Sequence, residues 1–394
     1  MRRVLGGLLL FSASAFGQAA PAVSGNEHFA KGEYSEAIVA YERVPQAERT
    51  GAVLGRLAVS LHMLNRLKEA EAAYKTAGKV APGESSPHNN LGSLYYSQRK
   101  FNDAEKEFRQ ALQREPENAV MRRNLRAARY ARENAKKARD VAASIAKERP
   151  LLIDQRQGDT LQVLTLLPQK DFDAANLYET RANTFLARKM FDDAIIEYKK
   201  SIAIDRYNAA AINRLGMAYH QQQKLDDAER QYREAVRLNP YYLEAMNNIG
   251  SIEYSRENYE RALSQYNKAL KIRPNSPTIM QNIGACLFAL KRYEEGTEVY
   301  QRALEIDPRL FDPSTNNFGT LVQTTQRSEP ELNFHLAIVF AERGDKDRAI
   351  SYLYKAVEEG FKDFGKIKEE KSFAILLEDE RYARLMETAA TVSR

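Results

Sequence analysis

The sequence predicts an all-α protein in which helix hairpins stack into an extended array. A pattern of apolar and small residues returns every 34 residues, as in Leu215-Gly216, Ile249-Gly250 and Ile283-Gly284. The 394-residue chain is 43% hydrophobic, enough to bury a large core. Its one cysteine, Cys286, excludes an intrachain disulfide framework and a cysteine-based zinc site.

Each repeat is expected to contain two amphipathic helices. In the repeat that starts at Ala209, places 7, 8 and 11 form a stripe on the first helix and places 20, 24 and 27 a stripe on the second; they hold Leu215, Gly216, Tyr219, Ala228, Tyr232 and Ala235. Pro240 follows at place 32, where it discourages the helix from continuing. A single hairpin leaves apolar surface in water, so neighbours must stack. We therefore expect the aromatic stripe Tyr198, Tyr232, Tyr266 and Tyr300 to lie in the core.

This pattern resembles the tetratricopeptide repeat, a helix hairpin with small residues at places 8, 20 and 27 and a proline near place 32. Matching repeats start at residues 51, 85, 175, 209, 243 and 277, and looser ones near 18 and at 330. The departures are Glu253 at place 11, Gly296 at place 20, and missing prolines after Ser201 and Ala356. The resemblance implies a right-handed α-solenoid whose first helices line a concave groove.

The repeat boundaries predict the domain organisation. We expect a signal peptide (1–17), about three repeats (18–118), a basic connector helix with an insertion (119–174), four repeats (175–310), a loop (311–329), a final hairpin (330–363) and a C-terminal helical cap (364–394). A lid over the groove is the alternative role for the loop. Within the insertion, the apolar Thr160–Leu167 segment is expected to be a short helix. Asn102, Asp192 and Asp226 are expected to cap second helices.

The first residues have the composition of an export signal. Arg2 and Arg3 precede an apolar run from Val4 to Phe16, and small residues such as Gly17 follow. Because the run is short for a membrane span, we expect cleavage and a periplasmic or secreted protein with no transmembrane span afterwards. The alternative is an uncleaved N-terminal anchor.

Residues 119–150 are expected to form one long basic helix. Ten basic and three acidic residues give this segment a net charge of +7, whereas the whole chain carries +6. A seam of alanines at three and four spacing would pack while the basic side faces water. The helix is either a solvated connector or a docking surface for an acidic protein or an anionic envelope polymer. The docking residues would be Arg122, Arg126, Arg129 and Lys136.

The resemblance also implies which side chains line the groove. The expected peptide-binding residues are Asn89, Asn90, Tyr96, Asn213, His220, Asn247, Asn248, Tyr254, Gln281, Asn282 and Phe288. An amide offers both a donor and an acceptor, so a row of amides can bond the backbone of an extended peptide whatever its sequence. This arrangement resembles the asparagine-lined groove of the O-linked N-acetylglucosamine transferases. The alternative is that the asparagines bond neighbouring helices to one another.

No catalytic motif accompanies the repeats. The sequence has no phosphate-cradling loop, no Gly-x-Ser-x-Gly turn and no two-histidine metal helix, so we expect no catalytic residue, cofactor or metal. The balance of 59 basic and 53 acidic residues gives no nucleic-acid signature. The sequence predicts a non-catalytic, exported scaffold that binds extended segments of other proteins. Docking through the basic helix and a structural role in an envelope complex are the alternatives.

Overall fold

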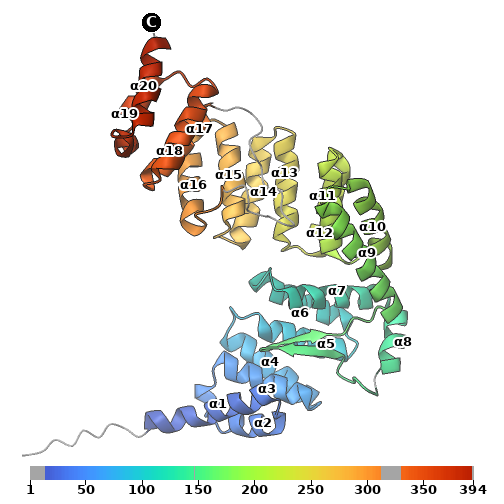
Figure 1. Cartoon of the computed structure of the whole chain (residues 1–394). Coiled ribbons are helices and arrows are strands. Elements are labelled where there is room, and N and C mark those ends of the chain that lie inside the picture. Colours follow the sequence, from blue (N-terminus) through green and yellow to red (C-terminus); the bar gives the residue numbers. More distant parts are fainter. Residues whose placement is uncertain (1–13, 146, 312–329, 393–394) are drawn as a thin grey trace, which may run out of the picture. The chain divides into compact units, whose positions relative to one another are not determined.

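The computed structural model describes residues 14–145, 147–311 and 330–392. In these ranges nearly all elements are helices, and successive helices pair into hairpins (Figure 1). The chain divides into two compact units. Unit 1 contains the described residues up to Leu177 together with Ala203–Asn208, and unit 2 contains Tyr178–Ile202 and the described residues from Ala209 onward.

Unit 1 is built from helix hairpins and one small β-hairpin. Its elements are α1 (Ser14–Lys31), α2 (Tyr34–Glu42), η1 (Gln46–Glu48), α3 (Gly51–Met63), α4 (Leu67–Val80), α5 (Ser86–Ser97), α6 (Phe101–Arg114), α7 (Ala119–Glu133), α8 (Ala135–Ile145), β1 (Ile153–Gln157) and β2 (Thr160–Val163). Helix α9 (Gln169–Ala187) begins in unit 1 and ends in unit 2.

Unit 2 continues the hairpins to the C-terminal end of the described chain. Its elements are α10 (Phe191–Ile204) except for its last two residues, α11 (Ala209–Gln221), α12 (Leu225–Leu238), α13 (Leu243–Ser255), α14 (Tyr259–Ile272), α15 (Pro277–Ala289), α16 (Tyr293–Ile306), α17 (Pro330–Glu342), α18 (Lys346–Glu358), α19 (Phe364–Glu369), η2 (Lys371–Leu376) and α20 (Glu380–Val392). The expectation of an all-α solenoid of helix hairpins is confirmed.

The first helix of a hairpin ends in the same way in repeat after repeat. Asn65 and Arg99 both adopt a left-handed backbone conformation, with φ of 60° and 61°. The following N–H, that of Arg66 or Lys100, then donates to a carbonyl five residues back at 2.9 Å. This bond satisfies a carbonyl that a helix end leaves open. The chain therefore reverses sharply, and the second helix packs against the first.

The close approach of paired helices depends on the small residue at place 8. A Cβ atom on Gly92 would lie 2.8 Å from the ring of Phe108, and one on Gly250 would lie 2.5 Å from the ring of Tyr266. Both rings are fully buried, as is Cys286. Burial raises the pKa of the Cys286 thiol to about 12. The aromatic stripes are therefore core, as predicted.

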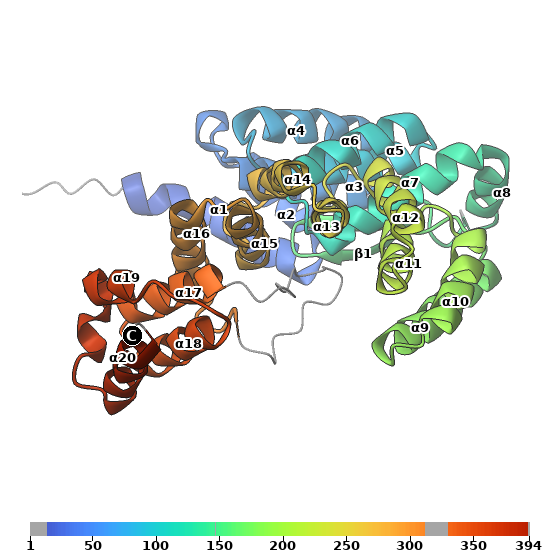
Figure 2. The same cartoon turned by 90° about the horizontal axis from the view of Figure 1, so that it is seen from above.

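The last helices of unit 2 bury the apolar residues of the expected cap. Figure 2 shows α17, α18, α19 and α20 gathered at the C-terminal end. Phe334 stacks on Phe361 with ring centroids 4.6 Å apart, and Phe373 and Leu385 are buried in the same cluster. Leu377, between η2 and α20, is by contrast 67% exposed.

The basic segment 119–150 is not one long helix, so that prediction is wrong. Helix α7 ends at Glu133 and α8 begins at Ala135, with Asn134 between them at φ −114° and ψ 41°. The Asn134 amide donates to the carbonyl of Tyr130 at 3.0 Å. Such a local side-chain bond competes with regular helix geometry, and it marks where the helix is interrupted.

The expected short helix at Thr160–Leu167 is also wrong. Thr160–Val163 form strand β2, which pairs antiparallel with β1. A short apolar run has no periodicity that separates a strand from a helix. The segment forms a strand because its backbone groups bond to a second strand and to side chains of neighbouring helices.

The predicted side-chain caps of second helices are wrong as well. Helices α6 and α12 start two residues earlier than expected, after Lys100 and Lys224, and neither cap residue makes a side-chain cap bond. Asn102 and Asp226 instead lie in the first turn, as does Asp192 in α10. A carboxylate at that position still interacts favourably with the helix dipole.

Some predictions fall on residues outside the described ranges. These are residues 1–13 of the expected signal peptide and 312–329 of the expected loop. Among the described helices, none combines the length and the apolar character that crossing a bilayer requires.

Candidate functional site

An extended segment of the chain lies against the first helices of unit 1. Strands β1 and β2 form an antiparallel hairpin in which Gln157 pairs with Thr160. Gly158, at φ 58°, lies in the turn between them. Strand β2 contacts both α5 and α7, and Figure 1 shows the two strands beside α5.

Side-chain amides on α5 and α7 bond the backbone of this segment. Asn90 donates to the carbonyl of Asp159 at 2.6 Å and accepts from the N–H of Leu161 at 2.9 Å. Asn89 and Asn124 each donate to the carbonyl of Leu161 at 2.8 Å.

Further bonds extend this contact toward Leu164. Asn124 accepts from the N–H of Val163 at 2.9 Å, and the hydroxyl of Tyr96 donates to the carbonyl of Leu164 at 2.9 Å. We call Asn89, Asn90, Tyr96 and Asn124 the amide face of unit 1. This face bonds to backbone atoms, so these contacts do not depend on which side chains the segment carries.

The same asparagines also join neighbouring first helices. Asn124 donates to the side-chain oxygen of Asn89 at 2.7 Å, across a sequence separation of 35 residues. The same bond recurs in unit 2, where Asn248 donates to Asn213 at 3.0 Å and Asn282 donates to Asn247 at 2.7 Å. The two interpretations of the asparagines are therefore compatible, because in unit 1 one set of amides holds both the helices and a strand.

The side chains of β2 add apolar and charged contacts. Leu161 is fully buried in the cluster that contains Leu57, Leu91 and Leu94, and Val163 is 4% exposed. At the hairpin turn, the Asp159 carboxylate accepts from Nε of Arg56 at 3.0 Å. This hydrogen bond raises the pKa of the Arg56 guanidinium.

Strand β1 makes its own contacts with the helices of unit 1. The guanidinium of Arg156 donates to the carbonyl of Phe29 at 3.1 Å and lies 4.2 Å from the centre of the Phe29 ring. Arg56 also donates to the side chain of Asn26 at 2.8 Å. Residues of α1, α3, α5 and α7 therefore all contact the β-hairpin.

The predicted site residues of unit 2 are largely inside the structure. Asn213, Asn247, Asn248 and Asn282 are fully buried, and Gln281 is 9% exposed. The predicted site residues that carry rings contact other rings: His220 lies beside Tyr232, Tyr254 meets Tyr259 edge-on, and Phe288 lies against Tyr300. Burial lowers the pKa of His220 to about 4, so this imidazole is neutral at pH 7.

The four predicted docking residues do not form one open basic surface. Arg129 is 4% exposed and donates to Glu105 at 3.0 Å, and burial lowers the pKa of its guanidinium. Arg126 donates to Asp205 at 2.6 Å, and Arg122 to Glu117 at 2.9 Å.

Lys136 on α8 is exposed. The expectation that the basic side of this segment faces water thus fails for Arg129, because Glu105 on α6 draws its charge into the packed helices.

The structure adds residues that the list of predicted site residues lacks. Asn124 occupies place 6 of a repeat whose second helix is not visible in the sequence. Arg56, in the repeat that starts at residue 51, is an isolated charge in the sequence. The 34-residue step from Asn90 to Asn124 gives both asparagines the same place in their repeats. No comparable signal indicates Asp159, whose partner on α3 is distant in sequence.

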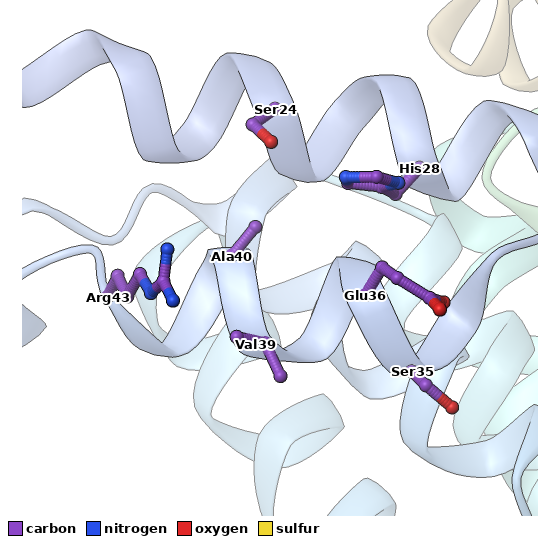
Figure 3. Close-up of a pocket in the computed structure, with 7 residues that line it drawn as sticks. All are labelled: Ser24, His28, Ser35, Glu36, Val39, Ala40 and Arg43. Atoms are coloured by element: carbon purple, nitrogen blue, oxygen red, sulfur yellow. The ribbon is translucent and has the colours of Figure 1, made fainter.

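One hollow lies away from the amide face. Figure 3 shows it between α1 and α2. It has a volume of about 340 Å³ and is lined by Ser24, His28, Ser35, Glu36, Val39, Ala40 and Arg43. His28, in the last turn of α1, forms a hydrogen bond with Glu33 at 2.6 Å. Within the described ranges, no group of three or more His, Cys, Asp or Glu residues could hold a metal ion.

Comparison with known families agrees with the hairpin architecture. Models described as tetratricopeptide repeat match residues 23–84, 86–118, 213–277 and 254–313. The chain is a tetratricopeptide repeat protein. Stacked repeats of this kind present extended concave surfaces, which such proteins use for binding.

Known tetratricopeptide repeat proteins are similar only over part of the chain. RNA polymerase II-associated protein 3 of Mus musculus is 25% identical over 197 residues, which are 50% of this chain and 28% of that protein. The chain thus spans little more than a quarter of that relative.

Two solved structures are also similar to part of the chain. The crystal structure of MamA is 19% identical with a TM-score of 0.34, and it covers 50% of this chain and 97% of its own. The pilF structure of Pseudomonas aeruginosa is 17% identical with a TM-score of 0.38, and it covers 57% of this chain and 90% of its own.

Proposed function

We propose that this protein is a non-catalytic scaffold that binds extended segments of other proteins along the amide-bearing first helices of its repeats. The observation that carries the proposal is the amide face of unit 1, where Asn89, Asn90 and Asn124 bond the backbone of an extended strand. Recognition of backbone groups by fixed donors and acceptors is one way in which proteins capture extended peptides.

Unit 2 repeats the same side-chain geometry over two successive steps. The pairs Asn213–Asn248 and Asn247–Asn282 correspond to Asn89–Asn124 of unit 1 in repeat place and in bond direction. Asn89 and Asn124 are fully buried with β2 bound to them, and the four asparagines of unit 2 are buried to the same extent. We assign the capture of partner segments to unit 2, with His220, Tyr254, Gln281 and Phe288 beside the amides.

Export is part of the proposal. The positive start at Arg2 and Arg3 and the apolar run from Val4 to Phe16 support a cleaved signal and a periplasmic or secreted location. The partner is then a protein of the same compartment. Docking of an anionic partner on the basic segment is less well supported, because Arg126 and Arg129 already bond carboxylates.

The test is a double variant that removes one complete amide pair of unit 2. Peptides are selected from a random displayed library on the full chain, and their affinities are then measured with Asn213→Ala/Asn248→Ala. We expect binding at least about tenfold weaker, because each lost backbone bond contributes about 1 kcal/mol. Removing both partners avoids leaving either one unsatisfied by the other.

The control is Asn258→Ala. Asn258 lies just before α14, donates to the Glu253 carboxylate and belongs to none of the amide pairs. This variant should bind the selected peptides as the wild type does, and far-UV circular dichroism should show all variants helical. Unchanged affinity of the double variant would refute the assignment to unit 2.

Protein purified from the exported fraction should begin near Gln18, and an intact Met1 would contradict cleavage.

A further inference from the structure

We propose that β2 is a tethered ligand that keeps the amide face of unit 1 closed to segments of other proteins. The face itself selects an extended segment with an acidic residue followed, at two-residue intervals, by two apolar residues. The proposal concerns unit 1, and it stands whether or not unit 2 binds partner segments as proposed above.

The first support is that the amides take the place of a neighbouring strand. Backbone groups of Asp159, Leu161 and Val163 bond to the amide face. Residues of a strand alternate in the side to which their backbone groups point, so those of Thr160 and Gln162 are directed to β1, with which both residues pair. An incoming segment without a β1 of its own would find the same donors and acceptors.

The second support is that the side chains of the bound segment supply selectivity. Leu161 is fully buried and Val163 nearly so, which sets two apolar positions at a spacing of two. Asp159, two residues earlier, bonds Arg56 through both carboxylate oxygens, at 3.0 and 3.2 Å. Arg56 is held in turn by Asn26 at 2.8 Å, so the cation is positioned by the helices and not by the strand.

The third support is the way in which the strand is attached. No residue of β1 is fully buried, and besides pairing with β2 the strand contacts unit 1 through Arg156 at the end of α1 and through the half-buried Ile153. The buried strand β2 is thus backed by an exposed or half-buried strand, and the short hairpin is joined covalently at both ends. A short tether gives an effective concentration in the millimolar range, so a partner segment must bind tightly enough to exceed it.

The probe is a synthetic, end-blocked peptide with the sequence of residues 157–166, carrying a fluorescent label. In one variant of the full chain, residues 154–163 are replaced by a Gly-Ser linker of equal length. In a second variant, Asp159→Lys places a cation beside Arg56 and weakens the hairpin while leaving the amide face unchanged. Binding is followed by fluorescence anisotropy.

We expect the peptide to bind both variants at least tenfold more tightly than the wild type. Adding Asn90→Ala and Asn124→Ala to the linker variant should reduce binding at least tenfold, and so should an aspartate-to-lysine change in the peptide at the position of Asp159. Adding Asn213→Ala/Asn248→Ala to the linker variant should change nothing, which separates this result from the test of unit 2.

Two outcomes would overturn the proposal. One is equal binding of the peptide to the wild type and to both variants. The other is a folded linker variant that does not bind the peptide. If the linker variant fails to fold, the Asp159→Lys variant decides: no gain in peptide binding there means that β2 is a permanent part of the core.

Discussion

Single side chains in this protein have functions that residue type alone does not reveal. Asn124 bonds at once to Asn89, to the carbonyl of Leu161 and to the N–H of Val163. One amide therefore contributes to helix stacking and to strand binding together. A substitution at this residue would change both, which is why the tests above delete amides in pairs and include a fold control.

His62 is a buried imidazole whose protonation should link stability to pH. The ring is fully buried, edge-on to Tyr74 at 6.1 Å, and burial lowers its pKa from 6.5 to about 4. The unfolded chain therefore binds the proton more readily than the folded chain. The contribution of His62 to stability is complete above pH 6.5 and is lost as the pH falls toward 4.

We predict that His62→Phe makes stability less sensitive to acid. Between pH 7 and pH 5, the wild type should lose about 2 kcal/mol of unfolding free energy through His62, and the variant should not. The measurement is urea unfolding of both proteins at the two pH values, followed by circular dichroism. An equal loss in both proteins would show that His62 titrates normally in the folded state.

At the scale of elements, buried charge holds α6 and α7 together. Glu105 on α6 is 3% exposed and accepts from Arg109 at 2.6 Å and from Arg129 on α7 at 3.0 Å. Arg132, one turn further along α7, lies 2.6 Å from the same carboxylate. A buried pair of this kind becomes costly when one partner loses its charge, because the other remains buried without compensation.

We predict that Glu105→Gln destabilises unit 1 by about 3 to 5 kcal/mol, because it leaves the Arg129 guanidinium buried without its counter-charge. The matched control is Glu133→Gln, which removes an exposed carboxylate that also contacts Arg132. That change should stay within about 0.5 kcal/mol of the wild type. Thermal unfolding compares the three proteins, and similar midpoints for both variants would disprove the structural role of Glu105.

The elements differ in how far the sequence predicts them. The helix hairpins follow from a period of 34 residues, because the same stripe must pack in each copy. Strand β2 could not be predicted in this way, since Thr160–Val163 is a short apolar run that becomes a strand through partners distant in sequence. Arg129 escaped prediction for a related reason, because counting charges along α7 does not show that Glu105 faces it.

At the scale of the whole molecule, order is built from local contacts. The large element contacts within each unit join helices that follow one another along the chain, apart from those made by the β-hairpin. In such an array stability is approximately a sum over repeats and their nearest neighbours. Damage to one repeat should therefore spread to its neighbours and fade within a few helices.

We predict opposite effects for two glycine substitutions in first helices of unit 1. In Gly92→Ala the new Cβ would meet the Phe108 ring at 2.8 Å and the Ala104 carbonyl at 3.2 Å, so this variant should lose about 1 to 3 kcal/mol. At Gly55, inside α3, no atom lies within 4 Å of the new Cβ. Gly55→Ala should therefore gain about 0.5 to 1 kcal/mol through helix propensity.

Hydrogen exchange followed by mass spectrometry measures where these effects act. Gly92→Ala should speed exchange in α3 to α7 and in β2, and it should leave α13 to α16 as in the wild type. A uniform increase along the whole chain would contradict nearest-neighbour behaviour. Slower exchange in Gly92→Ala than in Gly55→Ala would contradict the steric role of Gly92.

The double use of the amides has a mechanical consequence. Since Asn124 bonds both to Asn89 on the preceding first helix and to the strand that crosses them, flexing one hairpin against the next would stretch the strand's own bonds. Strand β2 therefore resists movement of α5 relative to α7. Without β2 the repeats would stay joined but bend more easily. Unit 1 should therefore be more rigid when a segment is bound to its amide face than when the face is empty.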